Sequence, residues 1–177
     1  MIRNVKEINR IAVSTAILAV CSWLTVPGGV PFTMQSFAVV TVAALFGGKC
    51  GFFTVLSYIL LGAMGIPVFS GMRGGIGILF GETGGYLFGF LVGAFVCGKI
   101  CEKNKSITVM FGAMLLNMFL CYVFGCLWVA VLYWGGENAV GVAALTGRFV
   151  LPFVIPDLIK IIVSIVVVTA IRKRGIA

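Results

Sequence analysis

Two ionisable residues stand inside the last apolar stretch of the sequence. Asp157 and Lys160 are three residues apart in an apolar run that extends over residues 149–171. Side chains at that spacing share one face of a helix, and ionisable groups inside an apolar span are costly enough to mark functional sites. The pair therefore predicts a polar ligand site, with a structural ion pair between two helices as the alternative. Pro156 favours the ligand site, because proline removes a backbone N–H and leaves carbonyl groups unpaired beside the charges.

The glycine-rich stretch over residues 62–89 is a second candidate site. Ten of its 28 residues are glycine, and its only charges are Arg73 and Glu82. Irregular backbone is tolerated in an apolar environment only where it is covered by protein or lines a cavity, so this stretch is expected to form the wall of a site. A guanidinium suits a carboxylate, and Gly74 and Gly75 permit close approach to a ligand. Arg73 is therefore predicted to bind an anionic group, either of a ligand or of lipid headgroups. Glu82 is predicted to pair with Arg73 or to cap the helix of the fourth span, since acidic groups favour helix N-termini.

Uncharged hydrogen-bonding residues could complete such a site. Thr33 and Gln35 follow a proline, and Tyr86 follows two glycines. Asn117 lies within a long apolar run, where an unpaired amide would be expensive. We expect Asn117 either to contact a ligand or to hydrogen-bond between helices, and Tyr86 either to stack on a ligand or to pack.

The composition places these residues in a membrane protein. Of the 177 residues, 61% are hydrophobic and 10% are charged, with a mean hydropathy of +1.18, whereas soluble domains carry about 25% charged residues. The net charge of +8 comes from basic residues at the ends of apolar runs. Nucleic-acid binding would require them to be clustered on a water-facing surface. The sequence therefore predicts an all-α integral membrane protein in contact with membrane lipid, and no nucleic-acid partner.

The breaks between apolar runs predict six transmembrane helices in a single integral membrane domain over residues 1–177. The expected spans cover approximately residues 11–26, 33–48, 51–65, 84–98, 107–134 and 149–171. With the N-terminus in the cytoplasm, ten basic residues lie inside and only Arg73 and Arg148 lie outside, as the positive-inside rule requires. Both termini are then cytoplasmic, and the unusual polar residues gather at one pocket that opens outward.

Several classes of chemistry are poorly supported. The chain has no histidine, and its six cysteines form no CxxC pair, so we predict no metal site and no cofactor. The stretch Phe46–Cys50 lacks the upstream glycine and the hydroxyl of a phosphate-binding loop. We therefore predict no catalytic residues and no enzyme activity, since binding and translocation of a ligand need none of these groups.

Four segments, in the same order along nearly the whole chain, resemble the motifs of the BioY family, the biotin-binding S components of energy-coupling factor (ECF) transporters. They are Val30–Gln35, Leu61–Phe69, Phe80–Tyr86, and Leu151–Pro152 with Pro156–Lys160.

The resemblance implies a six-helix S-component bundle in a prokaryotic plasma membrane. The receptor would bind biotin near the outer surface and work with a transmembrane coupling subunit and two cytoplasmic ATPases. By the same resemblance, Asp157 and Lys160 belong to the biotin site, and the loop from Arg73 to Gly75 and Tyr86 line it.

One departure from the family pattern concerns the cation. Some members have asparagine at the position of Arg73 and arginine at the position of Leu87. We predict that Arg73 binds the carboxylate of the valerate tail of biotin. Asp157, Lys160 and either Asn117 or Gln35 would then serve its ureido ring.

The first span carries Ala12 and Ala16, with Ala19 one turn further. Small residues at this spacing let helices approach closely, and in the family a similar pattern faces the coupling subunit. Packing inside this chain is the alternative.

Two other functions fit the same residues. One is a stand-alone proton- or ion-coupled carrier in which Asp157 titrates. The other is an intramembrane enzyme with Asp157 and Lys160 as acid and base.

Overall fold

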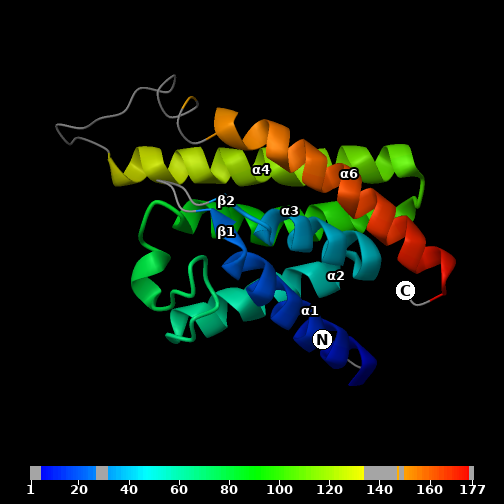
Figure 1. Cartoon of the computed structure of the whole chain (residues 1–177), viewed down its shortest axis with the longest axis horizontal. Helices are drawn as coiled ribbons and strands as arrows, with labels where there is room; N and C mark the ends of the chain where they lie inside the picture. The colour runs from blue at the N-terminus through cyan, green and yellow to red at the C-terminus, as the bar shows by residue number, and fades with distance from the viewer. Residues whose placement is uncertain (1–4, 27–31, 134–146, 148–149, 176–177) are drawn as a thin grey trace.

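The computed structural model describes residues 5–26, 32–133, 147 and 150–175, and this part of the chain is almost entirely helical (Figure 1). Its five long helices are α1 (Val5–Trp23), α2 (Gln35–Ala63), α3 (Gly84–Lys103), α4 (Ile107–Leu132) and α6 (Leu151–Lys173). The all-α fold class predicted from the composition is therefore confirmed.

Short elements connect the helices. Strands β1 (Thr25–Val26) and β2 (Phe32–Thr33) pair antiparallel between α1 and α2, with Thr25 opposite Thr33. A single 3-10 turn, η1 (Ile76–Ile78), lies in the loop over residues 64–83. Figure 1 shows this loop at one end of the long axis, and the first turn of α1 and the last turn of α6 toward the other end.

Helix α2 contains a kink. Gly47 has φ +87° inside the helix, so two helical segments meet there. The spans expected over residues 33–48 and 51–65 correspond to these two segments, but the break falls at Gly47 and residues 48–51 are helical. Glycine adopts a positive φ at little cost. The backbone N–H of Gly48, which has lost its helical partner, donates to Oε1 of Glu102 at 3.0 Å.

The ends of the other helices also differ from the expected spans. Helix α1 begins at Val5 and ends at Trp23, whereas the expected span covered residues 11–26, and Val26 is in β1. The polar residues before Ile11 include no proline or glycine, so nothing stops the helix from extending through them. Helix α4 ends at Leu132, and Tyr133 forms a turn. The expected start of the last span, residue 149, lies outside the described residues.

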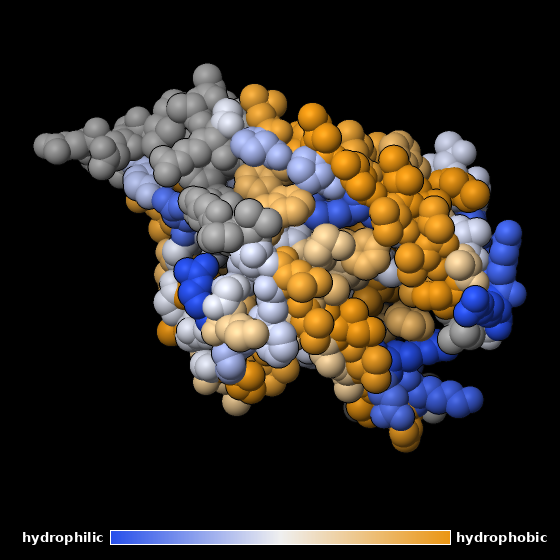
Figure 2. Space-filling view, in the orientation of Figure 1, coloured by the Kyte–Doolittle hydropathy of each residue, from blue (hydrophilic) through white to orange (hydrophobic). Residues whose placement is uncertain are grey.

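Four of these helices (α2, α3, α4 and α6) are long and apolar enough to cross a membrane. Large apolar side chains on α4 and α6 are strongly exposed, among them Phe119, Leu127, Ile155 and Val166. Figure 2 shows hydrophobic residues across the middle of the visible face and hydrophilic residues mainly toward its two ends. An apolar surface of this extent marks contact with a membrane, so this is a membrane protein.

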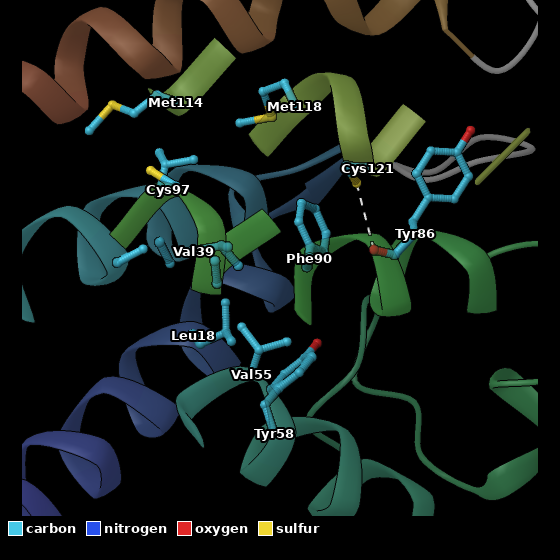
Figure 3. Close-up of a cluster of buried hydrophobic side chains, with 14 of the residues drawn as sticks. Leu18, Val39, Val55, Tyr58, Tyr86, Phe90, Cys97, Met114, Met118 and Cys121 are labelled. Atoms are coloured by element: carbon cyan, nitrogen blue, oxygen red, sulfur yellow. Dashed lines mark hydrogen bonds between the residues drawn. The ribbon is translucent and has the colours of Figure 1, made fainter. Parts of the chain in front are cut away.

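The buried core joins α1, α2, α3, α4 and α6, the last through Ile161 and Val168. Figure 3 shows Leu18 and Tyr58 on one side of it and Met114 and Met118 on the other, with Phe90 near its centre. These side chains come from four helices, so the core fixes the helices relative to one another.

The loop over residues 64–83 is tied to the helix ends on both sides. From the end of α1, the Ser22 hydroxyl donates to the Val68 carbonyl and Trp23 Nε1 donates to the Pro67 carbonyl. From α4, Trp128 Nε1 donates to the Gly81 carbonyl at 3.0 Å. Hydrogen bonds from two helices therefore hold the loop in place.

Because α3 crosses α2 closely at its kink, adding a single methyl group at the crossing should destabilise the fold. A Cβ on Gly98 would lie 2.4 Å from the backbone nitrogen of Gly48. Overpacking of this kind typically costs about 1–3 kcal/mol, so Gly98→Ala should lower the thermal unfolding temperature of the detergent-solubilised protein. Gly112→Ala is the matched control, because a Cβ there meets nothing within 4 Å. Equal unfolding temperatures for the two variants would contradict the predicted close crossing.

Candidate ligand-binding site

A pocket lies between the loop over residues 64–83 and helices α2, α3, α4 and α6. About 730 Å³ within it is free of protein atoms, its open mouth included. The residues that line it are Thr33, Gln35, Ser36, Tyr58, Phe69, Ser70, Arg73, Ile78, Thr83, Tyr86, Leu87, Phe90, Met118, Cys121, Tyr122, Phe153, Asp157 and Lys160.

Asp157 and Lys160 form a buried ion pair in the wall of this pocket. Nζ of Lys160 lies 2.9 Å from Oδ1 of Asp157, and the two residues are 7% and 5% exposed. Their spacing on α6 brings both side chains to the same face of the helix, as the sequence predicted. Charges buried in an apolar interior require a partner and further hydrogen bonds to offset the loss of water.

Those further bonds come from two other helices. The Ser36 hydroxyl, on α2, donates to Asp157 Oδ1 at 2.9 Å, and the Tyr122 hydroxyl, on α4, donates to Asp157 Oδ2 at 2.6 Å. Lys160 donates to the Thr33 carbonyl at 2.6 Å and to Ser36 Oγ at 3.0 Å. The ion pair thus joins α6 to α2 and α4, and it also lines the pocket. The two alternatives raised from the sequence, a polar ligand site and a structural ion pair, are therefore compatible with one another.

An aromatic ring covers the lysine. Nζ of Lys160 lies 4.0 Å from the centre of the Phe32 ring, and that ring stacks on Phe153. Attraction of a cation to a ring face strengthens when water is excluded. The ring therefore stabilises the charge where the pocket gives it little water.

Gln35 and Thr33 stand at the start of α2. The Thr33 hydroxyl accepts the backbone N–H of Gln35 at 3.2 Å, which satisfies one of the free N–H groups of the first helical turn. The Gln35 side chain is buried, and its Nε2 has no hydrogen-bond partner among the described residues. A buried donor without an acceptor is costly, so Gln35 is well placed to donate to a ligand.

Arg73 lies in a tight turn of the loop. The backbones of Phe69 and Arg73 exchange hydrogen bonds, and the chain between them passes through positive φ at Gly71 and Met72. Arg73 is exposed, and Nε donates to the Ser70 carbonyl at 3.1 Å. The guanidinium therefore lines the pocket on its accessible side. Leu87, where the family pattern can place arginine, lines the same pocket.

Tyr86 also lines the pocket, and it packs against α4 where the Cys121 thiol donates to its carbonyl, as Figure 3 shows. Glu82 accepts a hydrogen bond from the Tyr133 hydroxyl at 2.5 Å. Glu82 does not pair with Arg73, which was the first of its two expected roles. It does not cap α3 either, because the cap residue is Thr83, which makes no side-chain capping bond.

Three predicted site residues are not among those that line the pocket. Gly74 packs on the chain itself, because a Cβ there would lie 2.5 Å from the Ile66 carbonyl oxygen. Gly75 donates its N–H to the Gly62 carbonyl at 2.7 Å. Asn117 is fully buried against Gly93 between α4 and α3, and its amide has no partner among the described residues. Their roles toward a ligand stay predictions.

Sequence reasoning missed most of the residues that line the pocket, among them three helical residues that carry hydroxyl groups. Ser36, Tyr58 and Tyr122 line the site, and two of them bind Asp157 directly. The only available signal was position: Ser36 follows Gln35, and Tyr122 is a polar aromatic inside a long apolar run. Serine and tyrosine are too common in membrane helices for that signal to be specific.

Ala12 and Ala16 lie elsewhere. Both are exposed on α1 and line a shallow groove with residues of the second half of α2, including Ser57 and Leu60. They are therefore accessible to another helix and do not contribute to the pocket.

The pocket can bind an amphiphilic small molecule. Its polar groups form two sets, one around Asp157 and Lys160 and one at Ser70 and Arg73, and apolar side chains such as Phe90 complete the wall. The first set offers both donors and acceptors, and the second offers a cation. A ligand with a hydrogen-bonding head and an anionic tail would satisfy both sets.

Comparisons with known proteins agree along nearly the whole chain. A model of the BioY family matches residues 1–176. The protein named "Biotin transporter BioY" from Thermotoga maritima is 36% identical over 169 residues, which cover 95% of this chain and 96% of the relative. "Probable biotin transporter BioY" from Pyrococcus horikoshii is 35% identical over 163 residues, covering 92% and 93%.

A solved structure described as the S-component for biotin from an ECF-type ABC transporter has the same fold. It superposes with a TM-score of 0.83 at 26% sequence identity and covers 96% of this chain and 92% of that one.

The buried ion pair predicts a specific pattern of stability. Asp157→Leu or Lys160→Met alone leaves one charge buried without its partner, which typically costs about 3–5 kcal/mol. The double variant removes both charges and should recover most of that loss. Thermal unfolding of the purified variants measures this. Single variants as stable as the wild type would contradict the burial of the pair.

Proposed function

This chain belongs to the BioY family, and we propose that it is the biotin-binding S component of an ECF transporter. It binds its substrate and is not an enzyme. The observation that carries the proposal is convergence: six residues predicted from separate segments of the sequence line one pocket of the fold. They are Thr33, Gln35, Arg73, Tyr86, Asp157 and Lys160.

The two polar sets match the two ends of biotin. The ureido ring has N–H donors and a carbonyl acceptor, which suit the Asp157 carboxylate and the donors of Lys160 and Gln35. The valerate carboxylate suits the Arg73 guanidinium, which can bind it through two N–H groups. Since both Arg73 and Leu87 line the pocket, a cation at either position could serve the tail. We infer that Arg73 takes the place of the arginine that some members of the family carry.

We place the protein in the plasma membrane of a prokaryotic cell, with six spans and both termini in the cytoplasm. The Gly47 kink supports this count, because it divides α2 into two helical segments and so turns five helices into six. The grouping of the described helix ends (Figure 1) supports termini on one side. The pocket then opens outward, and the receptor would tilt to release biotin inward as its ATPases cycle.

The groove at Ala12 and Ala16 is proposed to receive the transmembrane coupling subunit, which associates with two cytoplasmic ATPases. Both alanines are exposed and their small side chains leave room for a second helix. A stand-alone carrier is not favoured, because the matching solved structure is part of an ECF-type transporter.

Calorimetric titration of the purified receptor with biotin tests the proposed function, and Arg73→Ala tests the placement of the tail. Wild-type protein should bind biotin. Loss of a hydrogen-bonded charge contact typically costs about 1.5–3 kcal/mol, so Arg73→Ala should bind biotin about tenfold or more weakly and should lose little affinity for biotin methyl ester. Met72→Ala, an exposed neighbour outside the pocket lining, is the control. Equal losses for both ligands would refute the role of Arg73, and no binding by the wild type would refute the function.

The groove on α1 gives a separate expectation. Ala12→Leu with Ala16→Leu should abolish co-purification with the coupling subunit while biotin affinity is retained, because the groove lies away from the pocket. Val13→Leu, at an exposed position on the same helix, should co-purify normally. If the double variant lost biotin binding as well, the alanines would be packing residues within this chain.

A further inference from the structure

Helix α2 is open at the Gly47 kink, and charged residues of two other helices bind the groups that the opening leaves free. In an unbroken helix the Gly48 N–H would donate to the Ala44 carbonyl, but the φ of +87° at Gly47 separates them. The Gly48 N–H donates instead to Glu102 of α3. The Ala44 carbonyl accepts from Nη2 of Arg172, on α6, at 2.6 Å. A cation suits the carboxyl end of a helical segment, so Arg172 caps the first segment of α2.

Arg172 is the last of a row of polar residues that lie on one face of α6, at helical spacing, and bond to α2. The members of this polar row are Asp157, Lys160, Ser164 and Arg172. Their partners follow in the same order along the first segment of α2: Ser36, Thr41 and Ala44. The middle contact joins the hydroxyls of Thr41 and Ser164 at 2.9 Å, and both residues are buried. The polar row therefore runs from the pocket to the kink.

Much of what holds α6 to the other helices is polar. Five of its residues are buried, and only two of them, Ile161 and Val168, are apolar. Large apolar side chains such as Ile155 and Val166 are exposed. Lipid is as apolar as these side chains, so close packing and hydrogen bonds, rather than a hydrophobic driving force, hold membrane helices together. The polar row therefore fixes how far α6 is rotated and shifted against α2.

We propose that Arg172 is a positioning residue for the ligand site: by binding the Ala44 carbonyl, it holds α6 in the register at which Asp157 and Lys160 face the pocket. The inference rests on the proposed function, because biotin is the ligand that reports it. Arg172 does not line the pocket, and it lies about 22 Å from Asp157 along the axis of α6. It acts through the helix, because hydrogen bonds weaken steeply when their distance or angle changes.

Arg172→Met tests the proposal, because it keeps an unbranched side chain and removes the donor to Ala44. Changes remote from a site typically alter the coupling to it by a factor of about 2 to 30. The variant should therefore raise the Kd for biotin by such a factor, measured well below its Tm. Arg172→Lys keeps a cationic donor and should retain most of the affinity. Arg174→Met is the control, since it removes the same charge from an exposed side chain, and it should bind biotin as the wild type does.

Two results of these titrations would overturn the proposal. An unchanged Kd in Arg172→Met, whatever its Tm, would mean that Arg172 only stabilises the fold. An equal rise in Arg174→Met would assign the effect to the net charge at this end of α6. Both results differ from failure of the proposed function, in which the wild-type receptor itself would not bind biotin.

Double variants test whether Arg172 acts through Asp157. Effects of residues this far apart usually add. Arg172→Met and Arg73→Ala should add, because Arg73 lies on the loop and not on α6. Arg172→Met and Asp157→Asn together should cost less affinity than the sum of the two, because the register of α6 matters less once the Asp157 charge is gone. Additive losses in the second pair would contradict a role through Asp157.

Hydrogen exchange in the wild-type protein does not depend on how well a variant folds. If the Arg172 contact favours biotin binding, linkage requires that biotin favours the contact by the same factor. Saturating biotin should therefore slow amide exchange in the last turn of α6, over residues 169–173, and leave the first turn of α1 unchanged. Equal exchange in this last turn with and without biotin would overturn the proposal.

Discussion

The interaction on which the structure depends is the ion pair between Asp157 and Lys160 in an apolar interior. Two charges removed from water are tolerated only where every remaining donor and acceptor finds a partner. Here the partners come from separate elements: Ser36 from α2, Tyr122 from α4, and the Thr33 carbonyl from β2. The need to satisfy the pair therefore brings three segments to one point of α6. The pocket is the space beside that point, so the interaction that joins the helices also supplies the polar end of the site.

Glycine provides the second constraint, and its role is mainly packing. Gly98 lets α3 cross the kink in α2, and Gly62 lies under the Phe69 ring, where a Cβ would be 2.1 Å from ring atoms. Gly74 rests on the backbone of the same loop. These contacts, with the hydrogen bonds from α1 and α4, hold the loop so that Arg73 stays beside the pocket. The glycines therefore act through the position of Arg73, and the structure does not place Gly74 or Gly75 in the lining.

The pocket separates its two tasks in space. The head of a ligand meets the buried Asp157–Lys160 network and Gln35, whose Nε2 has no partner among the described residues, so binding there selects for donor and acceptor pattern. The tail meets an exposed guanidinium, which can attract an anion from solution. Apolar side chains of the pocket remove the ligand from water, which contributes affinity that does not depend on the orientation of the contacts. This arrangement fits a receptor that must bind an amphiphilic small molecule and later release it.

The sequence by itself determined the membrane class, the helical fold, and the residues that the pocket uses as charges. Asp157, Lys160 and Arg73 were predictable because a charge in an apolar chain is expensive and therefore conspicuous. The neutral residues Thr33, Gln35 and Tyr86 were predicted as well, but only the tertiary structure decided which other neutral residues join them. Ser36, Tyr58 and Tyr122 enter the site through the packing of α2 and α4, and Asn117 lies outside the lining because it packs against Gly93. A serine or tyrosine hydroxyl is far less conspicuous in an apolar run than a charge, and its role depends on what the fold places within hydrogen-bonding distance.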